Sequence, residues 1–191
     1  RCTAWAKDRG SHDGRCLLML GPIHPAEGFV PLLRALAEIG SESNGWHIVI
    51  AGRETGDWRK MLEAAIRRKG AEDRVLLASA SDPGSQRAWL ARASALVAPA
   101  LHVRFPVSIM QAVAAGIPVL ATTCVAPVGL KDVIRVCGPT RYDLKIALRA
   151  LFQLTDDDRA AFGRRAHDVG RAVLDWSVLV DRYVRFYQSL C

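Results

Sequence analysis

The stretch VSIMQAVAAGIPVLATT, residues 107–123, joins a helix to a strand through a glycine and a proline. We expect the helix to end at Gly116, because glycine readily adopts the left-handed backbone that closes helices. Pro118 cannot continue a helix, and the apolar residues around it form a buried strand. Small residues along the helix let it lie close against a sheet. A helix that leads directly into a buried strand is typical of an α/β protein.

The same alternation continues on both sides of this stretch. Apolar runs that predict strands occupy residues 16–21, 46–52, 73–79, 95–100, 117–123 and 132–136. Amphipathic segments that predict helices occupy residues 29–40, 57–70, 85–93 and 107–116. Strands that are apolar throughout are typical of a parallel sheet covered on both faces. Right-handed crossovers then give an α/β, doubly wound, Rossmann-like sheet of about six strands.

After about Pro139 the strands stop and three helical segments complete the chain. They cover residues 142–154, 155–174 and 175–190. Thr155 precedes three aspartates and is the expected N-cap, since an acidic first turn suits the helix dipole. The aromatic residues of the last segment recur at helical spacing, which predicts packing in a core or against another domain.

Composition places the chain among soluble globular proteins. Half of its 191 residues are hydrophobic and 24% are charged, enough for one domain with a sizeable core. No apolar run approaches the ~20 residues that span a bilayer. The formal net charge is +7, which fits an arginine-rich solvent-exposed surface and also suits an anionic ligand, nucleic acid or a membrane surface. The basic residues form no single stripe and no nucleic-acid motif accompanies them, so we expect no nucleic-acid partner.

The five cysteines are scattered without metal-binding spacing. Free thiols indicate a reducing compartment, so we expect a cytoplasmic protein, and its charge leaves peripheral membrane association open. Cys16 lies in an apolar run and is expected to be a small core residue. The chain opens on Arg1 rather than Met, which leaves open that it is a piece of a longer protein.

Ligands of doubly wound sheets bind outside the carboxyl ends of the strands, near helix N-termini. On this topology alone, four loops are candidate sites. They cover residues 21–28, 51–57, 78–84 and 98–106.

These loops carry motifs in an order that resembles a known family. The motifs are GPIHPAEG (21–28), IVIAGRE (48–54), DRVLLAS (73–79), PALHVRFPVSIMQAVAAGIPVLAT (99–122) and DWSVLVDRYVRFYQSL (175–190). Together they resemble the C-terminal, donor-binding domain of retaining GT-B glycosyltransferases of family four, the glycosyl transferases group 1. The resemblance extends over nearly all of residues 17–190.

The resemblance implies a domain that binds a nucleotide-diphosphate sugar for transfer to an acceptor hydroxyl with retention of configuration. It implies no metal and no cofactor, with the nucleotide sugar as a substrate. It divides the chain into an N-terminal segment or linker, residues 1–15, and one GT-B C-terminal-like domain, residues 16–191. An N-terminal acceptor-binding domain or partner chain would complete the active site, so this chain alone is not expected to be active, and no catalytic residue is assigned.

The chain departs from the family at ligand-binding positions. Where the family has an Arg and a Lys in the first loop, this chain has Pro22 and Glu27. A carboxylate repels a diphosphate, and proline has no N–H to donate. The family's paired glutamates fall on Val103 and Gln111. Val103 cannot accept a hydrogen bond from the sugar, whereas Gln111 keeps an acceptor oxygen for the ribose hydroxyls.

The family's GFG segment, whose amides lie near the phosphates, is Arg104, Phe105 and Pro106 here. Arg104 at the helix mouth and Arg53 after the second strand are candidate replacements for the missing cations. Phe105 and the Gly21 loop would shape the pocket, and the third loop would face the nucleobase. The donor-binding residues assigned on these grounds are Gly21, Arg53, Ser79, Arg104, Phe105 and Gln111.

Two other interpretations remain open. The substitutions also fit a catalytically silent domain that acts as a scaffold or partner-binding module. A third interpretation is a domain that binds a different anionic nucleotide on the same sheet.

Overall fold

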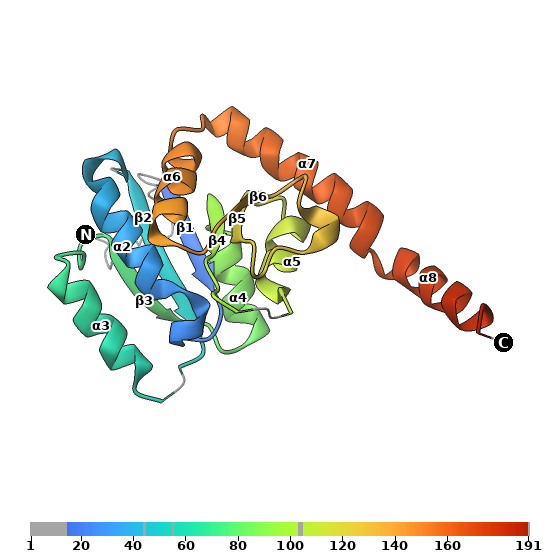
Figure 1. Cartoon of the computed structure of the whole chain (residues 1–191), viewed down its shortest axis with the longest axis horizontal. Helices are drawn as coiled ribbons and strands as arrows, with labels where there is room; N and C mark the ends of the chain where they lie inside the picture. The colour runs from blue at the N-terminus through green and yellow to red at the C-terminus, as the bar shows by residue number, and fades with distance from the viewer. Residues whose placement is uncertain (1–14, 44, 55, 103–104, 191) are drawn as a thin grey trace.

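The computed structural model describes residues 15–43, 45–54, 56–102 and 105–190 and contains one six-stranded parallel sheet (Figure 1). Its strand order is β3-β2-β1-β4-β5-β6, and every neighbouring pair is parallel. This order confirms the predicted doubly wound topology, with the reversal between β1 and β4. The strands are β1 (Arg15–Leu20), β2 (Trp46–Gly52), β3 (Val75–Ser79), β4 (Ala95–Ala98), β5 (Val119–Thr122) and β6 (Arg135–Cys137).

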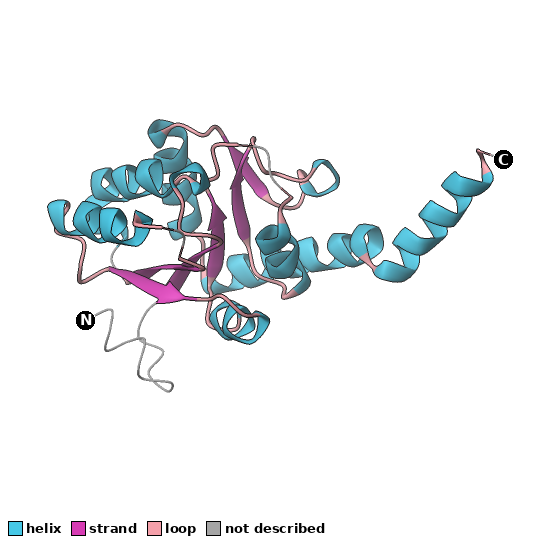
Figure 2. Cartoon of the chain, turned by 90° about the horizontal axis from the view of Figure 1, so that it is seen from below, coloured by secondary structure: helices cyan, strands magenta, loops and turns pink. Residues whose placement is uncertain are grey.

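Helices cover both faces of the sheet, and the secondary-structure view shows the resulting layers (Figure 2). One face is covered by α2 (Phe29–Ile39), α3 (Trp58–Arg68) and α6 (Arg141–Phe152). The other face is covered by α4 (Pro83–Leu90), α5 (Val107–Ala114) and α7 (Asp156–Leu174). Three short 3-10 helices that the sequence did not predict are η1 (Pro25–Glu27), η2 (Gly40–Ser43) and η3 (Val128–Leu130).

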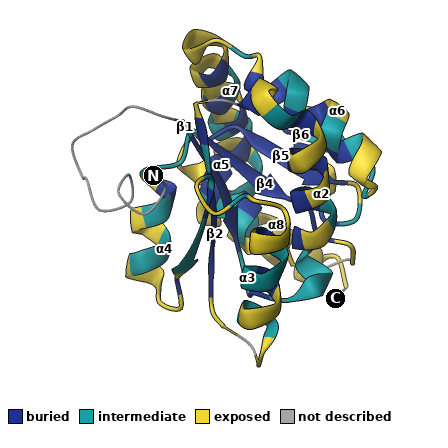
Figure 3. Ribbon diagram, turned by 90° about the vertical axis from the view of Figure 1, so that its left-hand side faces the viewer, coloured by how far each residue is buried: buried dark blue, intermediate teal, exposed yellow. Residues whose placement is uncertain are grey.

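Two hydrophobic clusters hold these layers together. Most of the strand residues between them are buried (Figure 3). In β1, Leu17 and Met19 belong to the cluster under α2 and α6, whereas Leu18 and Leu20 belong to the cluster under α5 and α7. Cys16 lies in the second cluster and is fully buried, as the sequence predicted. Successive side chains of a strand point to opposite faces, so burial on both faces requires the continuous apolar runs.

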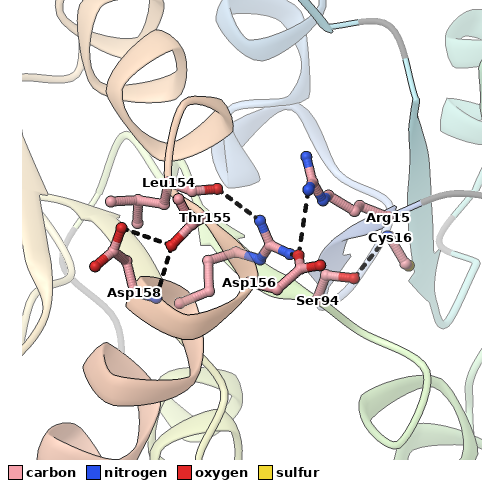
Figure 4. A network of polar contacts seen from close by, with 8 residues as sticks. Arg15, Cys16, Ser94, Leu154, Thr155, Asp156 and Asp158 are labelled. Carbon is pink, nitrogen blue, oxygen red and sulfur yellow. Dashed lines mark hydrogen bonds and ion pairs between the residues drawn. The ribbon is translucent and has the colours of Figure 1, made fainter.

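Polar contacts at the amino-terminal edge of the sheet attach α7 (Figure 4). The Thr155 hydroxyl accepts a hydrogen bond from the Asp158 N–H at 3.1 Å, which confirms the predicted N-cap. Arg159 is buried and pairs with Asp156, and Arg15 at the start of β1 reaches the same carboxylate at 3.2 Å. The acidic first turn therefore serves the helix and its attachment to the sheet.

The last helix, α8 (Trp176–Gln188), extends away from the sheet (Figures 1 and 2). None of its described residues is buried. Its neighbour in the fold is α7. Within the described ranges, no helix is long and apolar enough to cross a membrane.

Candidate functional site

A pocket of about 350 Å³ lies where the strand order reverses. Its walls come from the ends of β1 and β4, the loops that follow β2 and β3, and the first turns of α4 and α5. Ligands of doubly wound sheets bind at this crevice, because the loops from β1 and β4 diverge to opposite faces there. The pocket therefore lies where the topology predicts a site.

Two glycines bring the loops of the pocket together. A Cβ on Gly52, at the end of β2, would lie 1.6 Å from the Gly21 carbonyl oxygen, and the Gly21 N–H donates to Ala51 at 3.1 Å. Gly28 has a φ of +80°, and a Cβ there would lie 1.8 Å from the Pro99 carbonyl oxygen after β4. Only a residue without a Cβ permits these approaches. Both glycines are thus required by the geometry of the site.

The first loop carries the residues that replace the family's cations. Pro22 and Glu27 both line the pocket. The loop is shaped by His24, whose Nδ1 accepts the Ala26 N–H at 3.1 Å. Its ring packs against that of Trp58 in a T-shaped arrangement, with 5.6 Å between the ring centroids. His24 therefore serves the conformation of the loop.

The third loop lines the pocket with two of its residues. Ser79 is exposed at the end of β3 and does not line the pocket, whereas Ala80 and Ser81 do. Asp82 caps α4: its carboxylate accepts the Ser85 N–H at 3.0 Å and the Ser85 hydroxyl at 2.6 Å. The hydrogen bond from the Ser85 hydroxyl, together with that from its N–H, holds the pKa of Asp82 below its usual value. This cap fixes the start of α4 beside the pocket.

The fourth loop leads into α5. Thr122 on β5 is fully buried, and its hydroxyl donates to the Ala100 carbonyl at 2.6 Å, which holds the start of the loop against the sheet. Val103 and Arg104 lie outside the described residues. Phe105 lines the pocket with 77% of its surface exposed, and Gln111 lines it from one turn into α5.

The first amides of α5 are available to a ligand by helix geometry. Amides in the first turn have no carbonyl one turn earlier in the helix to bond. The Val107 N–H already bonds the Phe105 carbonyl at 3.0 Å. Ser108, which follows, lines the pocket. The positive end of the helix dipole therefore faces the pocket, where an anion is favoured.

Charged side chains in the pocket wall are few. Among the described lining residues, Arg53 is the one cation and Glu27 the one carboxylate. Arg53 is exposed in the loop after β2 and forms no ion pair with a described residue. In the described ranges, no group of three or more His, Cys, Asp or Glu side chains is arranged to hold a metal ion.

Two glutamines meet in the wall. The Gln111 amide nitrogen donates to the Gln86 amide oxygen at 3.4 Å, and the Gln86 nitrogen donates to the Ala80 carbonyl at 3.3 Å. Gln86 was missed by the sequence analysis, because a polar residue on an amphipathic helix is normally solvent-facing. The position of Gln86, one turn after the third loop, was the feature of the sequence that could have indicated its place in the pocket wall.

The predicted donor-binding residues thus have three different outcomes. The structure brings Gly21, Arg53, Phe105 and Gln111 into one pocket. Ser79 lies outside the pocket wall, and Arg104 lies outside the described residues. A second hollow of about 420 Å³ between α5 and α7 shares Phe105, Val107 and Gln111 with the first and is mostly apolar.

The doubly wound sheet with its terminal helices has the fold of GT-B glycosyltransferase domains, as three solved structures show. The C-terminal domain of the group 1 glycosyltransferase LpcC from Francisella tularensis superposes with a TM-score of 0.71 at 18% identity, over 81% of this chain and 83% of that one. A glycosyltransferase from Rickettsia africae superposes with a TM-score of 0.83 at 12% identity, over 98% of this chain and 50% of that one. HepE from Anabaena, solved in complex with UDP and glucose, superposes with a TM-score of 0.79 at 16% identity, over 98% of this chain and 52% of that one.

The sequence profile described as Glycosyl transferases group 1 matches residues 14–150. The chain belongs to this family. The GDP-mannose:cellobiosyl-diphosphopolyprenol alpha-mannosyltransferase of Xanthomonas oryzae pv. oryzae is 29% identical over 109 residues, which are 56% of this chain. The matched region is 29% of the length of that mannosyltransferase.

Proposed function

We propose that this domain binds a nucleoside diphosphate sugar as the donor side of a glycosyltransferase, for transfer of the sugar to an acceptor hydroxyl. The observation that carries this proposal is that Arg53, Gln111 and the N-terminus of α5 line the same pocket. A cation and free helix amides suit a diphosphate, and an amide oxygen suits the hydroxyls of a ribose.

In this proposal each wall of the pocket has one task. Arg53 and the first turn of α5 bind the diphosphate, whose negative charge grows as it leaves the sugar, and electrostatic stabilisation of that charge favours transfer. The Gln111 oxygen accepts from the ribose, and the loop at Ala80 and Ser81 lies beside the base. The carboxylate of Glu27 repels a diphosphate, and this repulsion limits how close the phosphates approach the first loop.

The relatives indicate which donors to test first. The Xanthomonas relative is named for GDP-mannose, so GDP is the first ligand, and UDP follows from the Anabaena protein. The chain spans about half of the Rickettsia and Anabaena chains. We therefore propose that an acceptor-binding domain or partner chain faces the same pocket and completes the enzyme.

Cys124 and Cys137 form no disulfide with a described residue, which supports a reducing, cytoplasmic setting in this proposal. The net charge of +7 supports contact with an anionic membrane surface as a further part of the proposal.

Calorimetric titration with GDP, UDP and ADP tests the proposal. We expect one of them to bind, and Arg53→Gln to weaken it about tenfold, because a charged hydrogen bond contributes about 1.5–3 kcal/mol. Arg67→Gln is the matched control, since Arg67 is exposed in the last turn of α3, away from the pocket. The affinity of the Arg67→Gln variant for the same nucleotide should equal that of the unmodified chain.

Failure to bind any of the three at millimolar concentration would reject the donor-binding proposal. The catalytically silent scaffold would then be the better interpretation. If Arg53→Gln leaves the affinity for these diphosphates unchanged and the chain also binds other anionic nucleotides, a different ligand on the same sheet would be favoured.

A further inference from the structure

The contact between Gln86 and Gln111 has a defined direction, because it begins at a backbone carbonyl. The Ala80 oxygen can only accept a hydrogen bond, so the group that meets it at 3.3 Å must be the nitrogen of the Gln86 amide. The Gln86 oxygen then faces position 111, and the residue there must donate. Gln111 does so through its nitrogen at 3.4 Å.

The same geometry assigns the other end of the Gln111 amide. Its nitrogen is committed to Gln86, so its oxygen is the atom that remains for a ligand. No described residue donates a hydrogen bond to that oxygen. Both glutamine side chains are half-buried in the wall of the pocket, which restricts their rotation.

We propose that Gln86 is a positioning residue that holds the Gln111 amide with its oxygen available to the ligand, so that this site requires an amide and not a carboxylate at position 111. The ligand-related part of this proposal rests on the proposed donor-binding function. A hydroxyl of the nucleotide sugar then donates its hydrogen bond to a neutral acceptor, the Gln111 amide oxygen.

A glutamate at position 111 would conflict with this arrangement twice. Its carboxylate would face the Gln86 oxygen, and turning the Gln86 amide would place that oxygen against the Ala80 carbonyl. It would also add a second carboxylate to a pocket in which Glu27 and Arg53 are the described charges. Restoring the family's glutamate is therefore expected to harm the site.

The test is a reciprocal charge exchange, read by calorimetric titration with the nucleoside diphosphate that binds. We expect Gln111→Glu to weaken binding about tenfold, because like groups would then face each other in the wall. Gln86→Lys alone should also weaken it, since an ammonium would attract the Gln111 oxygen and turn the amide. The double variant Q86K/Q111E should recover most of the affinity, because the ammonium can donate to both Ala80 and the new carboxylate.

Gln153→Glu makes the same chemical change at an exposed position at the end of α6 and should leave affinity unchanged. Binding by Gln111→Glu that equals or exceeds the unmodified chain would overturn the proposal. A double variant no better than Gln111→Glu alone would do the same.

A ligand-free measurement separates this proposal from the donor-binding proposal. In the intact chain, the side-chain amide signals of Gln111 in a nitrogen–proton correlation spectrum should shift on Gln86→Met and stay in place on Gln153→Met. A shift without any nucleotide binding would support the positioning role while rejecting the donor. An unchanged Gln111 signal would overturn the positioning role whatever the nucleotide result.

Discussion

At the scale of single residues, Gly28 links the first loop to the end of β4. Its φ of +80° is left-handed, and a Cβ there would meet the Pro99 carbonyl oxygen at 1.8 Å. That oxygen belongs to the backbone, so it cannot rotate away. The residue therefore combines a conformational requirement with a steric one, and both serve the shape of the pocket.

We expect Gly28→Ala to lower the free energy of unfolding by about 3 kcal/mol or more, as strain and backbone displacement add. Gly70→Ala is the control, because Gly70 has a φ of +58° but open space around its Cα. It should cost about 1 kcal/mol from backbone strain alone. Urea unfolding of both variants measures the difference. Equal losses would show that the contact with Pro99 is not restrictive.

Individual site residues differ in how far they could be predicted from the sequence. Gln111 was predicted from a motif whose spacing survives, and the structure places it in the pocket. Gln86 belongs to no motif and becomes part of the site because its side chain meets that of Gln111 across the pocket wall, a tertiary contact invisible in the sequence. Ser79 lies outside the pocket wall, since β3 continues to Ser79 and the chain turns into the pocket only afterwards.

At the scale of elements, the strands and helices were predictable because burial on two faces imposes long apolar runs between amphipathic segments. The 3-10 helices were not, since η1 depends on the His24 cap and on the close approach of Gly28 to Pro99. The packing of α7 against α5 also required the structure. Its inward residues include Gly163, Ala166 and Gly170, which let the two helices approach closely.

The glycines of α7 provide a matched pair for testing this packing. Gly163→Ala would bring a Cβ within 1.9 Å of the Gly116 carbonyl oxygen, whereas Gly170→Ala would meet the Val113 Cγ1 at 2.3 Å. Alanine gains about 1 kcal/mol of helix propensity at both. We expect a net loss of about 2 kcal/mol at Gly163, where backbone must move, and a change within about 1 kcal/mol at Gly170, where a side chain can turn.

Thermal and urea unfolding of the two variants decide this comparison. The reverse order of stability, with Gly170→Ala the weaker variant, would mean that the Val113 side chain is less free to move than the backbone at Gly116. Because α5 carries Gln111, nucleotide titration of Gly163→Ala would also report whether displaced packing reaches the pocket.

At the scale of the whole molecule, α8 is the element least attached to the rest. Trp176, Val180, Tyr183 and Tyr187 recur at helical spacing, and their exposed fractions are 73%, 37%, 56% and 63%. The sequence predicted that aromatics at this spacing pack in a core or against another domain. Within the described chain they do neither, so the face is available to another domain or chain.

An uncovered aromatic face has a measurable consequence for these 191 residues. We expect the chain to associate with itself as its concentration rises, since burial of apolar area is favourable at about 25 cal/mol per Å². Replacing Trp176, Tyr183 and Tyr187 together by serine should abolish this association in light scattering. The urea midpoint should remain nearly unchanged, because no described residue of α8 is buried.

The control for this prediction lies on the same helix. Serine at Asp181, Arg182 and Arg185 removes three exposed polar side chains and keeps the aromatic face, so association should persist. If both triple variants dissociate equally, charge rather than apolar contact holds the assembly together. If the aromatic variant also loses substantial stability, α8 must pack on the domain in solution, and its face would then be part of the core rather than a surface kept for a partner.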